Sequence, residues 1–105
     1  MIARIWRGTV RPDDAERYVD YVRKTGIEGY VNTPGNLGAH ILQRPLGDRV
    51  EVVTLTFWTS WDAIRSFAGD DPTLAVYYPE DDAYLLDRPE FVEHYEVPYS
   101  NIDQA

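Results

Sequence analysis

The strongest constraint on the fold is a change of hydrophobic period near the start of the chain. Residues 2–10 (IARIWRGTV) alternate between two sets of side chains, which predicts a β-strand. The next stretch (RPDDAERYVDYVRKTG) has apolar residues three and four positions apart, which predicts an amphipathic helix. Pro12 suits the first turn of this helix, and Gly26 suits its C-terminal stop. The apolar stripe consists of Ala15, Tyr18, Val19 and Val22.

Further elements follow at short spacing. Two strands are expected over residues 37–44 and 50–58, joined by a hairpin turn at PLGD. Ser60 suits the N-cap of a helix over WDAIRSFA. The remaining expected elements are helical turns from Asp71 to Tyr77 and from Pro79 to Leu86, and a last strand over residues 91–97.

This order of elements is typical of a ferredoxin-like α+β domain. We expect a four-stranded antiparallel sheet with the helices packed on one face. Alternation places Val53, Leu55 and Phe57 on the helix side of the third strand.

The second face of the sheet has no helix left to cover it. Its expected residues are apolar (Trp6, Leu42, Val50, Val52, Trp58, Val92) and polar or charged (Arg4, His40, Arg44, Thr54, Thr56, His94, Glu96). An apolar face of that size is rarely left to water. We therefore expect a second copy of the chain to cover it, which gives a two-fold homodimer and a dimeric α+β barrel.

The composition argues against several classes of function. The chain has 105 residues, no cysteine and a net charge of −8. Without cysteine there is no disulfide or Cys-ligated metal, and phosphate backbones repel an acidic surface, so no nucleic-acid partner is expected. No apolar run approaches the roughly 20 residues that span a bilayer, and no signal-peptide block is present, so we expect no membrane partner and a cytoplasmic protein. One domain is expected over residues 1–99, with a frayed tail over residues 100–105.

Three side chains are candidates for chemistry on the sheet. Arg7 shares the expected helix-facing side with Ala3 and Ile5, where a charge must pair, bind an anionic ligand or lie at the rim. His40 and His94 map to the uncovered face, where each could transfer protons or be satisfied by hydrogen bonds in a dimer interface. Only His94 and Glu96 have a spacing that suits a metal, and without a third ligand we expect no metal site.

The pair Tyr77–Tyr78 lies in the run FAGDDPTLAVYYPEDDAYLL. Adjacent residues of a helix differ by about 100° in direction. One phenol should therefore pack near Tyr18 and Phe67, and the other should face a cleft or solvent. A buried tyrosine needs a partner for its hydroxyl, which suits it to hold a phenolic or carbonyl ligand, although structural packing is the alternative. The acids of PEDD fit the N-terminus of a helix, and we assign them no catalytic role.

Motifs of the nucleophile-elbow, P-loop, dinucleotide and HExxH types are absent from the sequence. The stretch VVTLTFWTSWDAIRSFA has the pattern TLxxWxSxxAIxxF, and a YYPEDD stretch and an HYEV strand follow it. In these features the chain resembles the antibiotic biosynthesis monooxygenase-like domains of the dimeric α+β barrel superfamily. The resemblance covers nearly the whole chain. It implies a ferredoxin-like protomer, sheets joined face to face in a dimer, and a ligand pocket between sheet and helices.

The resemblance also implies an activity. Enzymes of this family oxidise aromatic polyketides to quinones without flavin, haem or metal, so we expect a small aromatic ligand and no cofactor. Together with the polar residues above, this gives two sets of site residues. The candidate catalytic residues are Arg7, Trp58, Tyr77 and His94, and the candidate ligand-binding residues are Tyr18, Phe67, Tyr78 and His40.

Haem-degrading members of the superfamily use an Asn–Trp–His set, whose positions fall near Ile5, at Phe67 and at or beside Tyr77. This chain differs at all three, so haem chemistry is not expected. Two functions stay open: a cofactor-independent oxygenase, and a non-catalytic binding or interaction module. The oxygenase requires an enclosed cavity of roughly 300 Å³ beside Arg7 and the tyrosines. The module predicts a filled interior.

Overall fold

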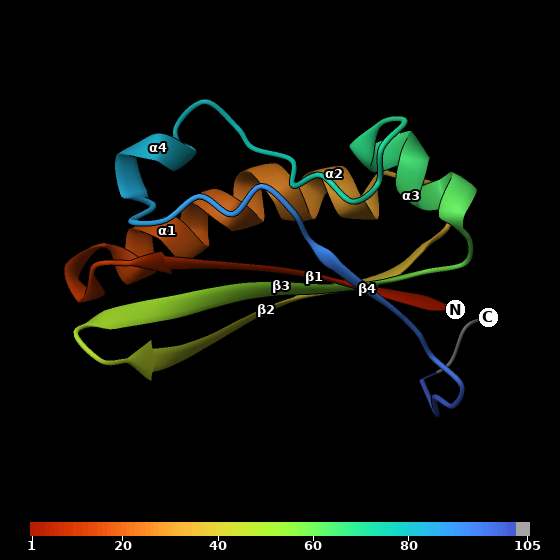
Figure 1. Ribbon diagram of the computed structural model, residues 1–105, viewed down its shortest axis with the longest axis horizontal. Helices are drawn as coiled ribbons and strands as arrows, with labels where there is room; N and C mark the ends of the chain where they lie inside the picture. The colour runs from red at the N-terminus through yellow and green to blue at the C-terminus, as the bar shows by residue number, and fades with distance from the viewer. Residues whose placement is uncertain (103–105) are drawn as a thin grey trace.

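The computed structural model describes residues 1–102. Its strands are β1 (Ile2–Val10), β2 (Asn36–Leu46), β3 (Arg49–Trp58) and β4 (Glu93–Glu96). They form one sheet in the order β2-β3-β1-β4, and each neighbouring pair is antiparallel. The helices all lie on one face of this sheet (Figure 1). The predicted ferredoxin-like α+β architecture is confirmed.

One long helical segment follows β1, in place of the shorter helix predicted there. It consists of a 3₁₀ turn (Pro12–Asp14), α1 (Ala15–Val22), a π-helical stretch (Arg23–Ile27) and α2 (Glu28–Val31). Gly26 does not stop this helix, because it lies buried inside the π-helical stretch. The buried stripe continues past it to Tyr30. Burial of the Tyr30 ring offsets the cost of a mid-helix glycine, which is about 1 kcal/mol.

The helical segment reaches β2 through a tight turn at Gly35, whose φ is 93°. A Cβ atom at this position would lie 2.5 Å from the Cβ of Ala63, so only glycine fits against α3 (Trp61–Ala68). Ser60 caps α3 as predicted, because its Oγ accepts a hydrogen bond of 3.1 Å from the backbone N–H of Ala63.

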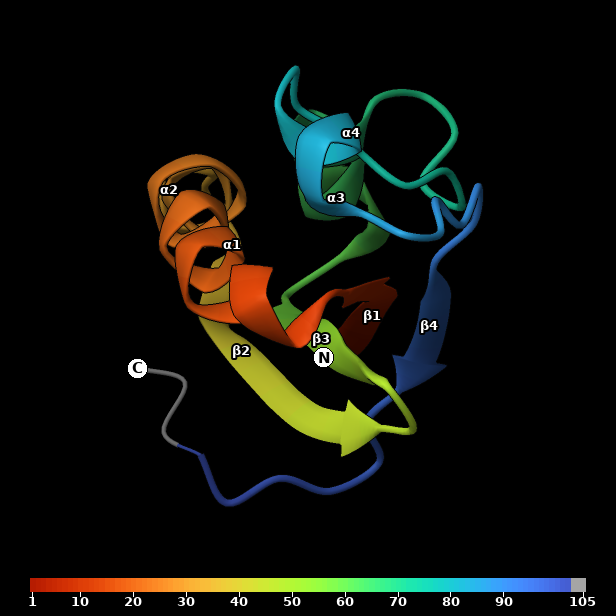
Figure 2. The same ribbon diagram turned by 90° about the vertical axis from the view of Figure 1, so that its left-hand side faces the viewer.

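The predicted orientation of β1 and β3 is wrong: each strand presents the opposite face to the helices. Trp6 packs against Tyr18 of α1, and Trp58 packs against Tyr30 of α2. The side chains that face away from the helices include Ile5, Arg7, Leu42, Val53 and Leu55, which surround one shallow hollow on the bare side of the sheet. We call this bare side the open face, and Figure 2 shows it from the end of the molecule.

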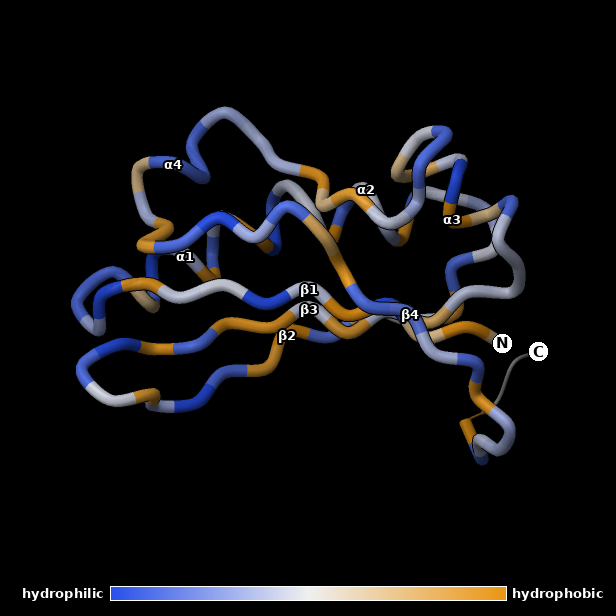
Figure 3. Tube along the Cα trace, viewed as in Figure 1, coloured by the Kyte–Doolittle hydropathy of each residue, from blue (hydrophilic) through white to orange (hydrophobic). Residues whose placement is uncertain are grey.

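The error has a physical cause in β3, which is apolar on both sides. Figure 3 shows hydrophobic residues through the middle of this strand. Consecutive side chains of a strand point to opposite faces, so apolar side chains lie on both sides. The threonines, whose type suggests a surface position, are buried and hydrogen-bonded. Thr54 Oγ1 lies 3.3 Å from the hydroxyl of Tyr30, and Thr56 Oγ1 accepts a bond of 2.8 Å from Trp58 Nε1. Polar side chains with such partners can occupy a core.

For the other strands the outcome is mixed. The prediction for β2 is confirmed, since Leu42 and Arg44 lie on the open face. The prediction for β4 is wrong at His94, which contacts Arg4 on the helix side of the sheet.

Residues 69–92 connect α3 to β4 and lie over the helix side of the sheet; we call them the covering segment. The predicted helix from Asp71 to Tyr77 does not form. Residues 72 and 73 form a turn, and Leu74 forms an isolated antiparallel bridge with Phe91. The second predicted helix shortens to α4 (Asp81–Tyr84). No helix among residues 1–102 is long and apolar enough to cross a membrane.

Candidate functional site

A small cavity lies between the sheet and the helices, beneath the covering segment. Its volume is about 30 Å³, which is room for one water molecule. The expected enclosed cavity of roughly 300 Å³ is therefore not present in this conformation. Three parts of the fold meet at the cavity: the sheet (Arg4, Trp6, Thr54), the long helical segment (Tyr18, Gly26, Tyr30) and the covering segment (Tyr77, Tyr78, Asp81).

The π-helical stretch supplies part of the wall. Thr25 and Gly26 belong to it and both line the cavity. The Thr25 hydroxyl is held by the backbone carbonyl of Tyr21, at 2.8 Å. Single π-helical turns inside α-helices occur often at functional sites, because the widened turn shifts the side chains that follow it.

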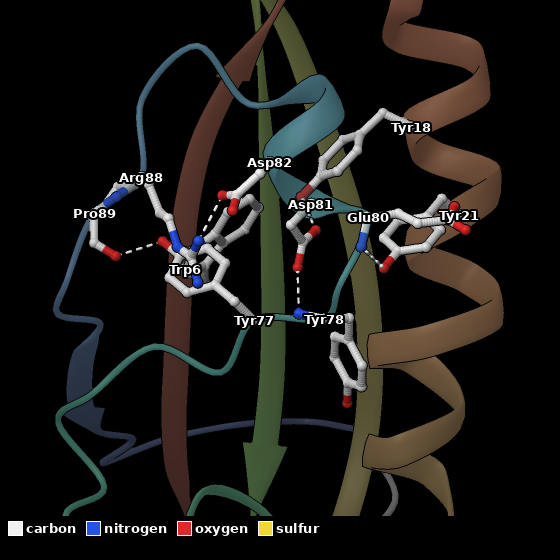
Figure 4. Close-up of polar contacts among 10 residues, drawn as sticks. All are labelled: Trp6, Tyr18, Tyr21, Tyr77, Tyr78, Glu80, Asp81, Asp82, Arg88 and Pro89. Carbon is white, nitrogen blue, oxygen red and sulfur yellow. Dashed lines mark hydrogen bonds and ion pairs between the residues drawn. The ribbon is translucent and has the colours of Figure 1, made fainter.

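The two neighbouring tyrosines of the covering segment point in different directions (Figure 4). The Tyr77 hydroxyl accepts a hydrogen bond of 3.2 Å from Trp6 Nε1 and donates to the carbonyl of Pro89. The guanidinium of Arg88 lies 4.3 Å from the centre of the Tyr77 ring, on its face. Tyr77 therefore fastens the covering segment to β1.

Tyr78, in contrast, is held in place by a hydrogen bond of its backbone and not of its hydroxyl. Its N–H donates to Asp81 Oδ2 at 2.6 Å, and its hydroxyl makes no hydrogen bond to another residue of the described chain. Burial raises the pKa of Tyr78, so the phenol stays protonated at neutral pH and can donate. Asp81 is only 5% exposed, and its Oδ1 accepts a bond of 3.1 Å from the Tyr18 hydroxyl.

Arg4 joins three parts of the fold. Its Nη1 donates to the carbonyl of Pro72, and its Nη2 donates to the carbonyl of Leu74 at 3.1 Å. Nη1 also lies 3.1 Å from Nε2 of His94, which must accept because a guanidinium has only donors. The ring of His94 in turn packs on Trp61, with ring centres 4.8 Å apart. Burial, and then the charge of Arg4, lower the pKa of His94 to about 4.

The structure brings three of the eight predicted site residues to the cavity: Tyr18, Tyr77 and Tyr78. Arg7 lies on the open face in an ion pair with Glu93, contrary to the prediction that it points toward the helices. His40 is exposed on β2, with its Nδ1 3.3 Å from the carbonyl of Leu55.

Two other predicted residues belong to the core. Trp58 is fully buried, and Phe67 packs on Tyr30 with ring centres 4.5 Å apart. Neither lines the cavity. His94 lies behind Arg4 and does not line it either.

Among the cavity-lining residues that sequence reasoning missed are Arg4, Trp6, Tyr30 and Asp81. Alternation assigns Arg4 and Trp6 to the wrong face, although a lone arginine between Ile2 and Trp6 is a signal in itself. Tyr30 lies beyond Gly26, the predicted end of the helix. Asp81 was missed because acidic residues are common at a helix N-terminus, so its presence there called for no further role. Among residues 1–102, no group of three or more His, Asp or Glu side chains is arranged to hold a metal ion.

Comparison with known proteins decides the family. A family model described as antibiotic biosynthesis monooxygenase matches residues 1–76. The chain belongs to this family. A crystal structure of a MhuD mutant with two manganese protoporphyrin IX molecules per active site has a similar fold. Its TM-score is 0.57 and its sequence identity 20%, over 98% of this chain and 100% of that one. No curated protein matches the chain.

The match to the monooxygenase family divides the cavity into two parts. Arg4, Trp6 and Tyr30 lie within the matched residues, whereas Tyr77, Tyr78 and Asp81 lie beyond them. Strands β1 to β3 and the long helical segment thus lie within the family match. Most of the covering segment, and β4, lie beyond it.

Protonation of His94 should lower stability. Its pKa is below that of an unfolded histidine, so between about pH 6.5 and about pH 4 the unfolded chain takes up a proton that the folded one does not. This contribution to the free energy of unfolding is therefore complete above that window and is lost as the pH falls through it. Urea denaturation at about pH 7 and about pH 5 measures it. We expect a smaller difference for His94→Gln and the wild-type difference for His40→Gln; equal differences in all three proteins would contradict the assignment.

The two tyrosines should differ in their contribution to stability. Tyr77→Phe leaves Trp6 Nε1 and the carbonyl of Pro89 without their partner, and should cost about 1–2 kcal/mol in the free energy of unfolding. Tyr78→Phe removes a hydroxyl that bonds to no described residue and should cost less than about 0.5 kcal/mol. Chemical denaturation of both variants compares them directly. A larger loss for Tyr78→Phe would refute these two roles.

Proposed function

We propose that the protein binds a small electron-rich aromatic molecule between sheet and helices and oxidises it with O₂ without a prosthetic group. Membership of the antibiotic biosynthesis monooxygenase family supports a monooxygenase or small-molecule-binding role. The observation that carries the proposal is the wall of the cavity. It combines aromatic rings with Tyr78, whose hydroxyl is a donor that bonds to no other residue among 1–102. An aromatic ligand with oxygen substituents matches both features.

Such a ligand enters only if the covering segment moves, because the closed cavity holds about 30 Å³. This segment contains a single four-residue helix, and hydrogen bonds along its length hold it to β1 and the long helical segment. They include the bonds of Arg4 to two backbone carbonyls, of Trp6 to Tyr77, of Tyr18 to Asp81 and of Thr9 to Asp87, and opening would have to break several of them. Loops of this kind open and close over active sites on microsecond to millisecond timescales.

The proposed reaction balances without an added reductant. A ring methylene flanked by hydroxylated rings reacts with O₂ to give a carbonyl and water, so that CH₂ + O₂ becomes C=O + H₂O. The substrate supplies all four electrons, and no flavin or metal takes part. The protein's contribution is to orient the ring, exclude solvent and donate a hydrogen bond from Tyr78 to a substrate oxygen.

A non-catalytic interaction module is the second candidate, and the small cavity is the observation that favours it. A nearly filled interior is what such a module predicts. The oxygenase requires the covering segment to open to a ligand, and the interaction module does not. Native mass spectrometry and oxygen uptake distinguish the two.

Native mass spectrometry of the purified protein, followed by oxygen uptake with hydroxylated anthrones and hydroquinones, tests the proposal. We expect a retained or added aromatic molecule and oxygen consumption above buffer. Tyr78→Phe should lower affinity or turnover by roughly 3–10-fold through the lost hydrogen bond. Tyr95→Phe, on β4 and 54% exposed, is the matched control and should behave as wild type. No binding and no uptake across the panel would favour the interaction module.

We also propose that two copies of the chain associate through their open faces. The open face carries an apolar row, Ile5, Leu42, Val53 and Leu55, around a hollow of about 270 Å³. Family membership supports this arrangement. Apolar surface of this kind is usually covered in solution, and a two-fold axis would place the two rows against each other.

Leu55→Glu places a charge in the middle of the proposed interface and should give a monomer. Val31→Glu replaces an apolar residue that is 58% exposed at the end of α2 and should leave the dimer intact. Size-exclusion chromatography with light scattering at micromolar concentration measures both. A monomeric wild-type protein would exclude the dimer.

A further inference from the structure

Arg4 carries a buried positive charge without a carboxylate partner. It is only 2% exposed, and it forms no ion pair with any of residues 1–102. Its acceptors are two backbone carbonyls and a neutral His94, none of which carries negative charge. A guanidinium has five N–H donors, so two remain without an acceptor in the described chain. Unpaired buried charge is costly, and such groups are usually paired or bind a ligand.

Asp81 carries a buried negative charge that likewise has no partner of opposite charge in the described chain. It is 5% exposed and forms no ion pair with any residue that the structure describes. Each carboxylate oxygen accepts one hydrogen bond, from the Tyr18 hydroxyl or from the Tyr78 backbone. Carboxylate oxygens have about four acceptor positions in all, so capacity remains.

The two charges face one cavity from different sides. Both residues line it, Arg4 from β1 and Asp81 from the covering segment, and they lie too far apart to pair with each other. Tyr30 also lines the cavity, and both charges shift the pKa of its hydroxyl. Burial raises its pKa most, the charge of Arg4 lowers it, and the charge of Asp81 raises it. The site is therefore polarised, with a positive and a negative side separated by aromatic rings.

We propose that the ligand of this site binds as an oxyanion, with its negative oxygen on Arg4 and a neutral hydroxyl on its far side donating to Asp81. This inference rests on the proposed function and narrows its ligand to hydroxylated aromatics that are already ionised, such as hydroxyquinones and the enolates of hydroxyanthrones. The free N–H groups of Arg4 supply donors on one side, and the free lone pairs of Asp81 accept on the other. Because the ligand arrives ionised, the protein needs no base to make it electron-rich.

A matched pair of ligands tests this on the unmodified protein. The hydroxynaphthoquinone lawsone is an anion at neutral pH, and its methyl ether has nearly the same shape without the charge. Isothermal titration calorimetry should show lawsone binding ~10-fold or more tightly than the ether, since a hydrogen bond to a charged group contributes that much. Equal binding of the two, or tighter binding of the ether, would overturn the inference and leave the proposed aromatic site standing. Binding of neither, with no binding across the wider aromatic panel, would overturn both.

Variants locate the effect. Arg4→Gln should abolish the preference for lawsone over the ether. Asp81→Asn should weaken the binding of a lawsone analogue that carries a second, neutral hydroxyl on its far ring, relative to lawsone itself, which has no hydroxyl to donate to Asp81. Arg7→Gln removes a guanidinium from the open face and should keep the wild-type preference. If Arg4→Gln does not fold, as circular dichroism would show, the wild-type ratio and the Asp81→Asn result decide. An Arg4→Gln protein that folds and retains the preference would refute the assignment of the oxyanion to Arg4.

Discussion

The hydrogen bonds of Arg4 are the contacts on which the arrangement of the helix side depends. The guanidinium starts from β1, reaches the neighbouring strand at His94 and holds the covering segment by the carbonyls of Pro72 and Leu74. Burial lowers the pKa of Arg4, but a guanidinium stays charged at neutral pH. The same side chain therefore fixes the position of the covering segment and places a positive charge at the cavity. If the proposed oxyanion binds there, one residue couples the structure of the helix side to ligand recognition.

The sheet has two apolar faces with different tasks. The helix side is packed with large rings and satisfied threonines, and it leaves only a small void beneath the covering segment. The open face is apolar but has no element of the described chain over it. A sheet built this way gains stability on one face within the protomer, and the other face is the one that the proposed dimer would cover. The polarised cavity and the apolar row are thus on opposite sides of the same strands, and a change in one need not disturb the other.

Much of the fold follows from the sequence, and the failures have specific causes. Alternation, helical spacing and turn residues predict the order of elements, the Ser60 cap and the antiparallel sheet. They do not predict the faces of β1 and β3, because a strand that is apolar on both sides gives no preference, and a shift by one residue reverses every side chain. Tyr77 and Tyr78 are recognisable in the sequence, but Arg4 and Asp81 are not. Their roles depend on contacts with residues far along the chain, such as Arg4 with Pro72 and Asp81 with Tyr18.

The family match ends at residue 76, and this boundary runs through the cavity. Strands β1 to β3 and the long helix lie within the match, whereas Tyr78 and Asp81 stand on a connection beyond it. Some side chains of this connection, such as Tyr77, Tyr84 and Leu85, pack against the hydrophobic core, and others line the cavity. A lineage built on this scaffold could acquire a new chemical preference by exchanging only the cavity-lining residues of this connection, while its core-packing residues, the strands and the long helix stayed as they were.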